Sequence, residues 1–368
     1  MSKIVFVVPG DPHQRTGGYR YDARILQALL DRGFDASVVG LDGAFPMVDD
    51  RAKESLTDAL MKPPAHATVV VDGLALGGMG DAIKHARALR SDPMTLVALV
   101  HHPLADERGL TDRDRAWLWQ QERSALACVD QVVVTSAFTA KRLVERGYLT
   151  DSPSVVCPGV DPAPLAAVAE INPAPRPEPT PANWLCVASL IPRKGHDVLL
   201  QALNQLGDRR WHCQWVGDDQ RHPEHAQRLW AEVKALGLSE RIDWLGEQDD
   251  ALLAATYHRA SLCVLPSHYE GFGMVVTEAL ARGLPVITTN GGALPQTLPD
   301  NAGLIVPAGD ARALAEALRQ WLDDASLRRS LQAGAREARA SLTSWAQAGE
   351  RFIDALGLST LEPKARQQ

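Results

Sequence analysis

Short apolar runs alternate with amphipathic helical patterns along nearly the whole chain of 368 residues. The runs are apolar throughout instead of alternating with polar residues, and most are followed by a helical pattern. This arrangement is typical of parallel strands whose two faces are both covered by helices. We expect strands at Ile4–Pro9, Ala36–Leu41, Thr68–Leu74, Thr95–His101, Gln131–Ser136 and Val155–Cys157, then at Trp184–Ser189, His212–Gly217, Ile242–Gly246, Leu262–Ser267, Val286–Asn290 and Leu304–Pro307.

Helices are expected between these strands. The helical ranges include Tyr19–Arg32, Gly80–Ser91, Arg113–Cys128, Ala137–Gly147, Gly195–Leu206, Pro223–Leu236, Gly273–Arg282 and Arg312–Asp323. Between the two sets of strands, residues 161–184 are rich in proline, which favours an extended linker over a regular element. We therefore predict a first doubly wound α/β domain at 1–162, a linker at 163–183 and a second such domain at 184–343. A further amphipathic helix, 344–358, could pack on either domain, including back on the first.

Composition narrows the class of protein. The net charge of −7 argues against a general nucleic-acid binder and against docking on an anionic membrane by charge alone. No apolar run approaches the ~20 residues of a membrane helix, although peripheral membrane contact stays open. The five cysteines are scattered, without CxxC or zinc-like Cys/His spacing, which favours core thiols and a cytoplasmic location.

The segment "SHYEGFGMVVTEALARG" holds two glutamates, Glu270 and Glu278, eight positions apart. The glycines around Glu270 place it in a strand-to-helix loop, and Glu278 then falls in the second turn of the helix. Small residues before a helix let backbone N–H groups point at an anion. Because a carboxylate repels phosphate, hydroxyls of a sugar or ribose are its natural partners. Alternatively, Glu270 caps the helix and Glu278 pairs with an internal arginine.

Three other features could carry chemistry. Arg193 and Lys194 directly precede Gly195 at the start of a predicted helix, which makes an anion-binding corner. Gly17 and Gly18 lie between the first strand and the first helix, the position of a phosphate-cradling turn. His101 and His102 lie at the carboxyl end of a strand, where ligands bind in doubly wound sheets.

"PSHYEGFGMVVTEALARGLPVITTNGG", with "IPRKGHDVLLQAL" upstream, resembles the retaining glycosyltransferases of family 4. The resemblance spans nearly the whole chain. It implies the GT-B fold, two Rossmann-like domains facing each other across a cleft. The first domain would serve the acceptor, and the second would bind the nucleotide sugar.

The resemblance also implies roles for the residues. Glu278 would bind the nucleotide ribose, and Glu270 would contact hydroxyls of the donor sugar. Arg193 and Lys194 would hold the diphosphate, with a cradle formed by Gly17, Gly18, Gly271, Phe272, Gly273, Met274 and Val275. A histidine would lie by the donor sugar and the acceptor; "HPLA" favours His102 over His101. Two departures weaken the match: Ala188-Ser189 stand where many members have Gly-Arg, and Gln296 stands where many have Glu.

The implied reaction is transfer of a hexose-type sugar from a nucleoside-diphosphate sugar to an acceptor hydroxyl with retention of configuration. No cofactor or metal is expected, because cations and helix dipoles meet the charge of the leaving group and no DxD triplet stands in a suitable loop. The alternatives are a GT-B nucleotide-sugar epimerase, a catalytically silent nucleotide-sugar-binding protein and a nicotinamide-dependent dehydrogenase. The sequence has no GxGxxG motif, which argues against the dehydrogenase. The nucleobase, sugar, acceptor and oligomeric state are not readable from the sequence.

Overall fold

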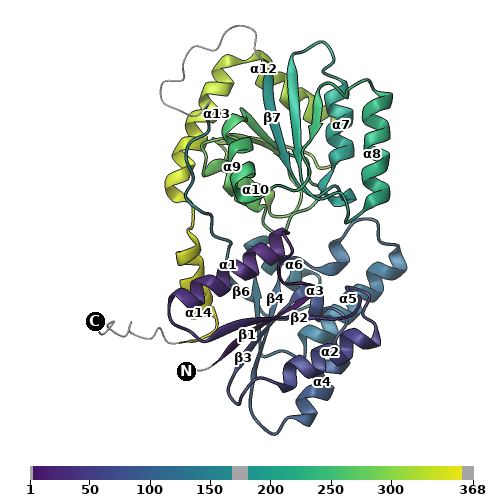
Figure 1. The fold of residues 1–368 in the computed structure, drawn as a ribbon, viewed down its shortest axis with the longest axis vertical. Coiled ribbons are helices and arrows are strands. Elements are labelled where there is room, and N and C mark those ends of the chain that lie inside the picture. The colour runs from purple at the N-terminus through teal and green to yellow at the C-terminus, as the bar shows by residue number, and fades with distance from the viewer. Residues whose placement is uncertain (1–2, 168–180, 359–368) are drawn as a thin grey trace, which may run out of the picture. The chain divides into compact units, whose positions relative to one another are not determined.

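A computed structural model describes residues 3–167 and 181–358, which divide into two compact units (Figure 1). Unit 1 runs to Gly159 and resumes at Thr343, and unit 2 comprises Val160–Leu342. Most of the predicted linker, residues 168–180, lies outside the described residues. Ala166, in its described part, is buried in the core of unit 2.

Unit 1 contains a six-stranded parallel sheet in the order β2-β1-β3-β4-β5-β6. Its strands are β1 (Ile4–Pro9), β2 (Ala36–Leu41), β3 (Thr68–Asp72), β4 (Thr95–Val100), β5 (Gln131–Val134) and β6 (Ser154–Val155). Its helices are α1 (Gly17–Asp31), α2 (Asp50–Met61), α3 (Gly73–Leu76), α4 (Gly80–Leu89), α5 (Asp112–Leu126), α6 (Ala137–Glu145) and α14 (Trp345–Ala355), with a 3-10 turn η1 (Leu104–Asp106).

Unit 2 repeats this plan with a parallel sheet in the order β12-β11-β10-β7-β8-β9. Its strands are β7 (Ala182–Val187), β8 (Trp211–Val216), β9 (Ile242–Trp244), β10 (Leu262–Leu265), β11 (Val286–Thr289) and β12 (Gly303–Val306). Its helical elements are η3 (Pro192–Lys194), α7 (His196–Asn204), α8 (Pro223–Ala235), α9 (Asp250–Arg259), α10 (Met274–Leu280), α11 (Leu294–Thr297), α12 (Ala311–Asp323), α13 (Ala325–Ala338) and η4 (Arg339–Ser341).

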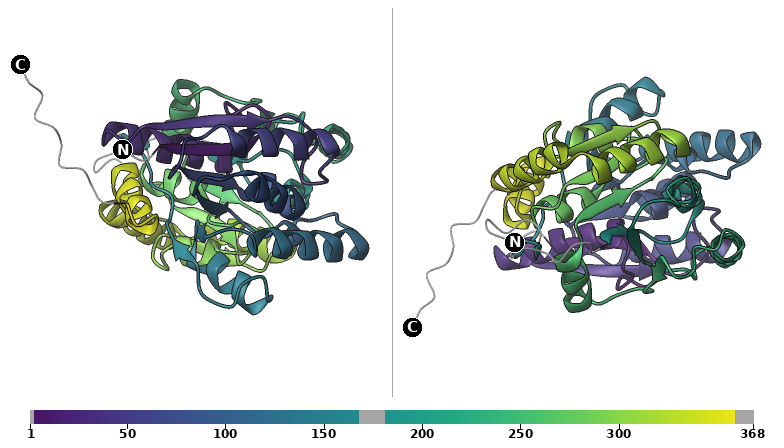
Figure 2. Two further views of the ribbon diagram at one scale, coloured as in Figure 1. Left: turned by 90° about the horizontal axis from the view of Figure 1, so that it is seen from below. Right: turned by 90° about the horizontal axis from the view of Figure 1, so that it is seen from above.

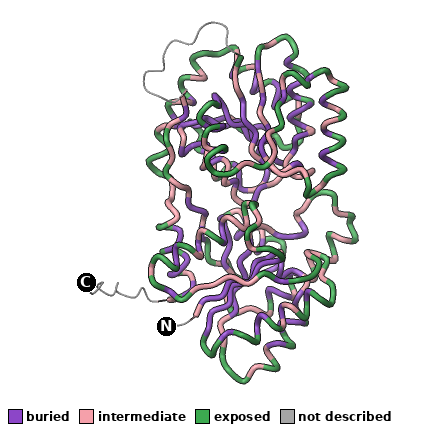
Figure 3. Tube along the Cα trace, viewed as in Figure 1, coloured by how far each residue is buried: buried purple, intermediate pink, exposed green. Residues whose placement is uncertain are grey.

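Both faces of each sheet are covered, which explains the continuous apolar strands. In β1, Val5 and Val7 join a core with α2 and α4, while Phe6 stacks on Phe352 of α14 at 5.8 Å between ring centroids. The burial colouring shows the strands largely buried and the outer sides of the helices exposed (Figure 3). Within the described residues, no helix is long and apolar enough to cross a membrane. The prediction of two doubly wound α/β domains is confirmed.

The observed elements differ from the expected ones mainly at their ends. The third strand ends at Asp72 instead of Leu74, because the Asp72 carboxylate accepts a 2.7 Å hydrogen bond from the N–H of Leu74 and caps α3. Gly17 and Gly18 are the first two residues of α1, not a turn before it. The helix 344–358 is observed as α14, which packs against α1 within unit 1 (Figure 2).

Each sheet has a point where the strand order reverses. In unit 2 it lies between β7 and β10, since the chain continues from β7 to β8 and β9 on one side and later fills the other side. In unit 1 it lies between β1 and β3. In open parallel sheets, ligands bind at the carboxyl ends of the strands at such a reversal. The two reversals therefore mark where to look for the site in each unit.

Candidate functional site

Two cations and a carboxylate meet at the reversal in unit 2. Arg193 and Lys194 end η3, just after β7, and Glu270 follows β10. Lys194 Nζ lies 2.6 Å from Glu270 Oε1, and Arg193 Nη1 lies 3.4 Å from Glu270 Oε2. Arg193 also donates to the carbonyl of Tyr269 at 2.8 Å, and Ser267 Oγ donates to Glu270 Oε1 at 2.6 Å. The fold thus assembles three of the predicted residues into one cluster.

The cations fix the charge of Glu270. Burial raises the pKa of this carboxyl, but Lys194 and Arg193 outweigh that effect and hold the pKa at about 2. Only 7% of Glu270 is exposed, so its charge is compensated inside the protein. The cluster thus brings two cations, Arg193 and Lys194, together around one buried carboxylate. Such a cluster can accept an anionic ligand.

Backbone conformation sets the geometry of the loop after Glu270. Gly273 is the N-cap of α10 with φ at 93°, a conformation that favours glycine, and a Cβ there would lie 2.7 Å from Leu294 Cδ2. Met274 and Val275 form the first turn of α10, where helix N–H groups lack partners within the helix. Gly292 forms an isolated parallel β-bridge with Glu270, which braces the loop from the neighbouring strand end.

Glu278 lies in the second turn of α10 and is only partly buried. The hydroxyl of Tyr257 donates to Glu278 Oε2 at 3.1 Å. Arg282 donates to the backbone carbonyl of Glu278 at 2.9 Å, and its guanidinium lies over the Tyr257 ring, 4.3 Å from the centroid. Tyr257 is thus one hydrogen-bond donor to the Glu278 carboxylate.

Gly18 and His101 are neighbours in unit 1. A Cβ on Gly18 would lie 3.3 Å from His101 Cδ2, so the absence of a side chain at Gly18 makes room for the imidazole. Gly17 has open space at the same position. Tyr21 meets the His101 ring edge-on, with 5.4 Å between centroids. The start of α1 and the end of β4 therefore converge at the reversal of this sheet.

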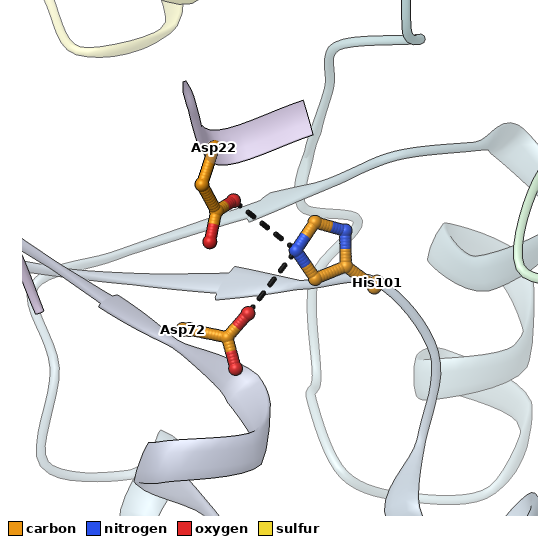
Figure 4. A group of neighbouring side chains, drawn as sticks. All are labelled: Asp22, Asp72 and His101. Carbon is orange, nitrogen blue, oxygen red and sulfur yellow. Dashed lines mark ion pairs between the residues drawn. The ribbon is translucent and has the colours of Figure 1, made fainter. Parts of the chain in front are cut away.

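His101 also lies between two aspartates (Figure 4). Its Nε2 is 3.2 Å from Asp22 Oδ1 and 3.1 Å from Asp72 Oδ2. Burial lowers the pKa of His101, but the two carboxylates outweigh it and raise the pKa to about 10. Burial raises the pKa of Asp22 to about 6, although the His101 charge opposes the rise. Three such groups could also hold a metal ion, since their ligand atoms lie within 4.8 Å of one another.

His102 has different surroundings. Its Nε2 lies 3.4 Å from Glu107 Oε2. The loop between them is anchored by the buried Glu122, whose Oε2 accepts from the N–H of Leu104 at 3.0 Å. Burial raises the pKa of Glu122 to about 8. Asp106 in the same loop is held by two hydrogen bonds from Arg142, at 2.7 and 2.8 Å.

Sequence reasoning missed four residues that complete these clusters: Asp22, Asp72, Tyr257 and Ser267. A signal existed for two of them. Asp72 is the one charged residue in its buried strand, and Asp22 is 5% exposed on the buried side of α1, next to Tyr21. A carboxylate in such a place needs a partner. Tyr257 and Ser267 carry no comparable signal, because hydroxyl residues are common at strand and helix ends.

The model of the family "Glycosyl transferases group 1" matches residues 169–338. A D-inositol 3-phosphate glycosyltransferase of Nocardia farcinica is 33% identical over 257 residues, which are 66% of this chain and 55% of that protein. A glycogen synthase of Mycobacterium tuberculosis is 35% identical over 170 residues, 46% of this chain and 40% of that protein. The chain thus spans about half the length of the curated relatives it matches.

Solved structures share the fold of both units. A sucrose-phosphate synthase from Thermosynechococcus elongatus has a TM-score of 0.79 at 23% identity, covering 96% of this chain and 98% of that one. The Anabaena protein Alr3699/HepE in complex with UDP-glucose has a TM-score of 0.73 at 15% identity, covering 96% and 99%. The fold is thus that of two Rossmann-like α/β domains. Residues 169–338 of the chain are thus similar to the group 1 glycosyltransferases.

Proposed function

We propose that this protein transfers a hexose-type sugar from a nucleoside-diphosphate sugar to an acceptor hydroxyl, with retention of configuration and without a metal. One observation carries the proposal. Arg193 and Lys194 converge on the buried Glu270 at the strand reversal of unit 2. The names of the matched relatives, which include a glycosyltransferase and a glycogen synthase, support sugar transfer.

Each residue then has a role. Arg193 and Lys194 bind the diphosphate and stabilise it as it departs, which removes the need for a metal there. The N–H groups of Gly271, Phe272, Gly273, Met274 and Val275 complete the cradle within unit 2. Glu270 holds the two cations in place and accepts hydrogen bonds from hydroxyls of the donor sugar. Glu278, oriented by Tyr257, accepts them from the ribose.

The reaction exchanges one bond at the anomeric carbon. The bond from this carbon to the phosphate oxygen breaks, and a bond to the acceptor oxygen forms on the same face. The acceptor proton passes to the departing phosphate. Both histidines are candidates for contact with the donor sugar. We favour His101, because it lies against Gly18 at the strand reversal, whereas His102 points to Glu107.

A thermal-shift panel tests the donor site. We would compare UDP, GDP, ADP, dTDP and NAD on the wild type, on Glu278→Ala and on the exposed control Glu316→Ala. A diphosphate at 100 times its Kd should stabilise by about 2.7 kcal/mol. The proposal expects one diphosphate to stabilise wild type and control but not Glu278→Ala. A response to NAD alone, or to none of the five, would contradict it.

Turnover assays separate the reaction from its alternatives. The proposal expects the donor to release nucleoside diphosphate when an acceptor is present, with unchanged rate in EDTA. NMR of the product should show the anomeric configuration of the donor. Conversion of the donor without an acceptor would indicate an epimerase, and binding without release would indicate a silent nucleotide-sugar-binding protein. A rate that collapses in EDTA and returns with a divalent cation would refute metal independence.

A further inference from the structure

Two buried carboxylates and an imidazole meet at one point in unit 1 (Figure 4). Asp22 of α1 is 5% exposed, and Asp72 at the end of β3 is 7% exposed. His101, just after β4, lies between them with 20% of its side chain exposed. Within the described residues, no lysine or arginine forms an ion pair with either aspartate. Because buried carboxylates are strongly destabilised without a cation, this group needs a positive charge.

Hydrogen bonds do not satisfy Asp22. Neither of its carboxylate oxygens, nor Nε2 of His101, has a hydrogen-bond partner among the described residues. Nε2 carries at most one proton, yet it faces Asp22 Oδ1 at 3.2 Å and Asp72 Oδ2 at 3.1 Å. One N–H cannot point at two oxygens at once. The Asp22 carboxylate is therefore buried without a hydrogen bond and directed at the same ring nitrogen as Asp72.

The distances suit a shared metal ion. Bonds from Zn²⁺ to imidazole nitrogen and carboxylate oxygen are ~2.0–2.2 Å long, so neighbouring ligand atoms in tetrahedral or octahedral geometry lie roughly 2.9–3.5 Å apart. Nε2 of His101 lies within that range of one oxygen of each aspartate. The three ligand atoms all lie within 4.8 Å of one another. Because no hydrogen bond fixes the Asp22 carboxylate, it can turn to complete the set.

The other two residues are held in place by their neighbours. Asp72 Oδ1 accepts from the N–H of Leu74 at 2.7 Å, and a hydrogen bond of this kind orients a ligating carboxylate. The backbone carbonyl of His101 accepts from Thr135 Oγ1 at 3.2 Å and from Thr139 Oγ1 at 3.4 Å, which fixes the strand end that carries the ring. Since part of His101 is exposed, an ion can reach the group from solvent.

We propose that Asp22, Asp72 and His101 bind a divalent transition-metal ion such as Zn²⁺. The ligands are Asp22 Oδ1, Asp72 Oδ2 and His101 Nε2, with water in the remaining positions. Two carboxylates and a neutral imidazole balance the charge of a dication, and the nitrogen ligand favours Zn²⁺ over Ca²⁺ and Mg²⁺, which prefer oxygen. A proton on Nε2 is released when the ion binds.

This site lies within unit 1 and does not rest on the proposed function. In that function, Arg193 and Lys194 of unit 2 meet the charge of the leaving group. Turnover in EDTA therefore stays the expectation, and the metal site needs a test that does not measure activity.

Binding of the metal alone to the full chain provides this test. The chain is stripped with EDTA, desalted and dialysed against Zn²⁺ or Co²⁺ with a phosphine reductant, which keeps its five cysteines reduced. We expect a single tightly bound ion per chain. Bound Co²⁺ should show visible d–d bands without the near-ultraviolet band of a thiolate ligand. In Asp22→Asn and in His101→Gln, the Kd should rise at least ~100-fold, since changes outside the ligand set already cost up to that much.

An exposed pair of the same chemistry supplies the control. His212 Nε2 lies 3.3 Å from Asp243 Oδ2, and no third ligating side chain joins them in the part of the chain that the structure describes. Asp243→Asn should therefore bind Zn²⁺ like the wild type. Zn²⁺ should raise the Tm of the wild type and of this control by several degrees, but not that of Asp22→Asn or His101→Gln. Far-UV circular dichroism in EDTA establishes that each variant is folded before the titration.

Four outcomes would overturn the inference. These are a wild type that binds no ion, equal affinity in the wild type and both site variants, a thiolate band from Co²⁺, and a Tm response to Ca²⁺ or Mg²⁺ as large as that to Zn²⁺. The second would mean adventitious binding only. Since none of these measurements needs a donor or an acceptor, they decide the metal site even if the nucleotide panel contradicts the proposed function.

Discussion

Replacement of Glu270 by glutamine tests the electrostatic account of the unit 2 cluster. The cations lower the pKa of Glu270 from 4.5 to about 2. Each pKa unit is worth 1.36 kcal/mol, so the shift contributes about 3 kcal/mol to stability. Because the folded pKa is the lower one, this contribution is fully present above pH ~4.5 and is lost as the pH falls through 2. Glu270→Gln should therefore lose about 3 kcal/mol at pH 7, and less than half of that at pH 3.

Urea unfolding followed by tryptophan fluorescence measures this loss. Six of the nine tryptophans lie in unit 2, so the signal mainly follows the unit that contains the substitution: Trp184, Trp211, Trp215, Trp230, Trp244 and Trp321. Glu316→Gln, which removes an exposed i,i+3 pair with Arg319, serves as the control and should leave the midpoint in place. A loss below 1 kcal/mol at pH 7, or one equally large at pH 3, would refute the reasoning.

Three further predictions concern single substitutions. Gly273→Ala should lower the Tm of unit 2 by several degrees more than Gly237→Ala, because both glycines have positive φ but only a Cβ at 273 would meet a side chain, Leu294; equal shifts in differential scanning fluorimetry would contradict this. The wild type should lose stability between pH ~5 and 8, because the raised pKa of the buried Glu122 makes the folded state bind more protons than the unfolded state in this range. Glu122→Gln should remove this loss, and Tm values of both proteins at pH 5 and pH 8 test the prediction. Lys194→Ala should reduce kcat/KM at least tenfold, roughly the 1.5–3 kcal/mol of a charge-assisted contact, while the surface variant Lys84→Ala keeps it; unchanged steady-state kinetics would remove Lys194 from the site.

The strands were predictable because they are buried on both sides. A strand such as Thr95–Val100 is apolar at nearly every position, and this pattern survives without any knowledge of its neighbours. The ends were harder to predict, since they depend on single side chains. Asp72 ends β3 through one hydrogen bond to the N–H of Leu74. The sequence alone does not show that this side chain caps the next helix.

The candidate site was predictable in part for a similar reason. Arg193, Lys194 and Glu270 stand out by their positions next to glycines and strand ends, and the sheet order brings them together. His101 and its partners Asp22 and Asp72 come from three segments that are far apart in sequence. Their proximity depends on β1, β3 and β4 lying side by side, which requires the topology and not only the pattern. The sequence favours His102 from a local motif, and the structure adds that His101 lies next to Gly18.

The return of α14 to unit 1 has a consequence for biosynthesis. Unit 1 is interrupted by the whole of unit 2, because its chain leaves at Gly159 and resumes at Thr343. Its core includes Phe352, stacked on Phe6, and Gly349, where a Cβ would lie 2.6 Å from Ala28 Cβ. A ribosome must therefore translate nearly 200 further residues before the α1 face of the first sheet can be covered. Unit 2 begins later in the chain but is the first unit whose residues are all synthesised. On the nascent chain, α1 lacks its packing partner until α14 has been made.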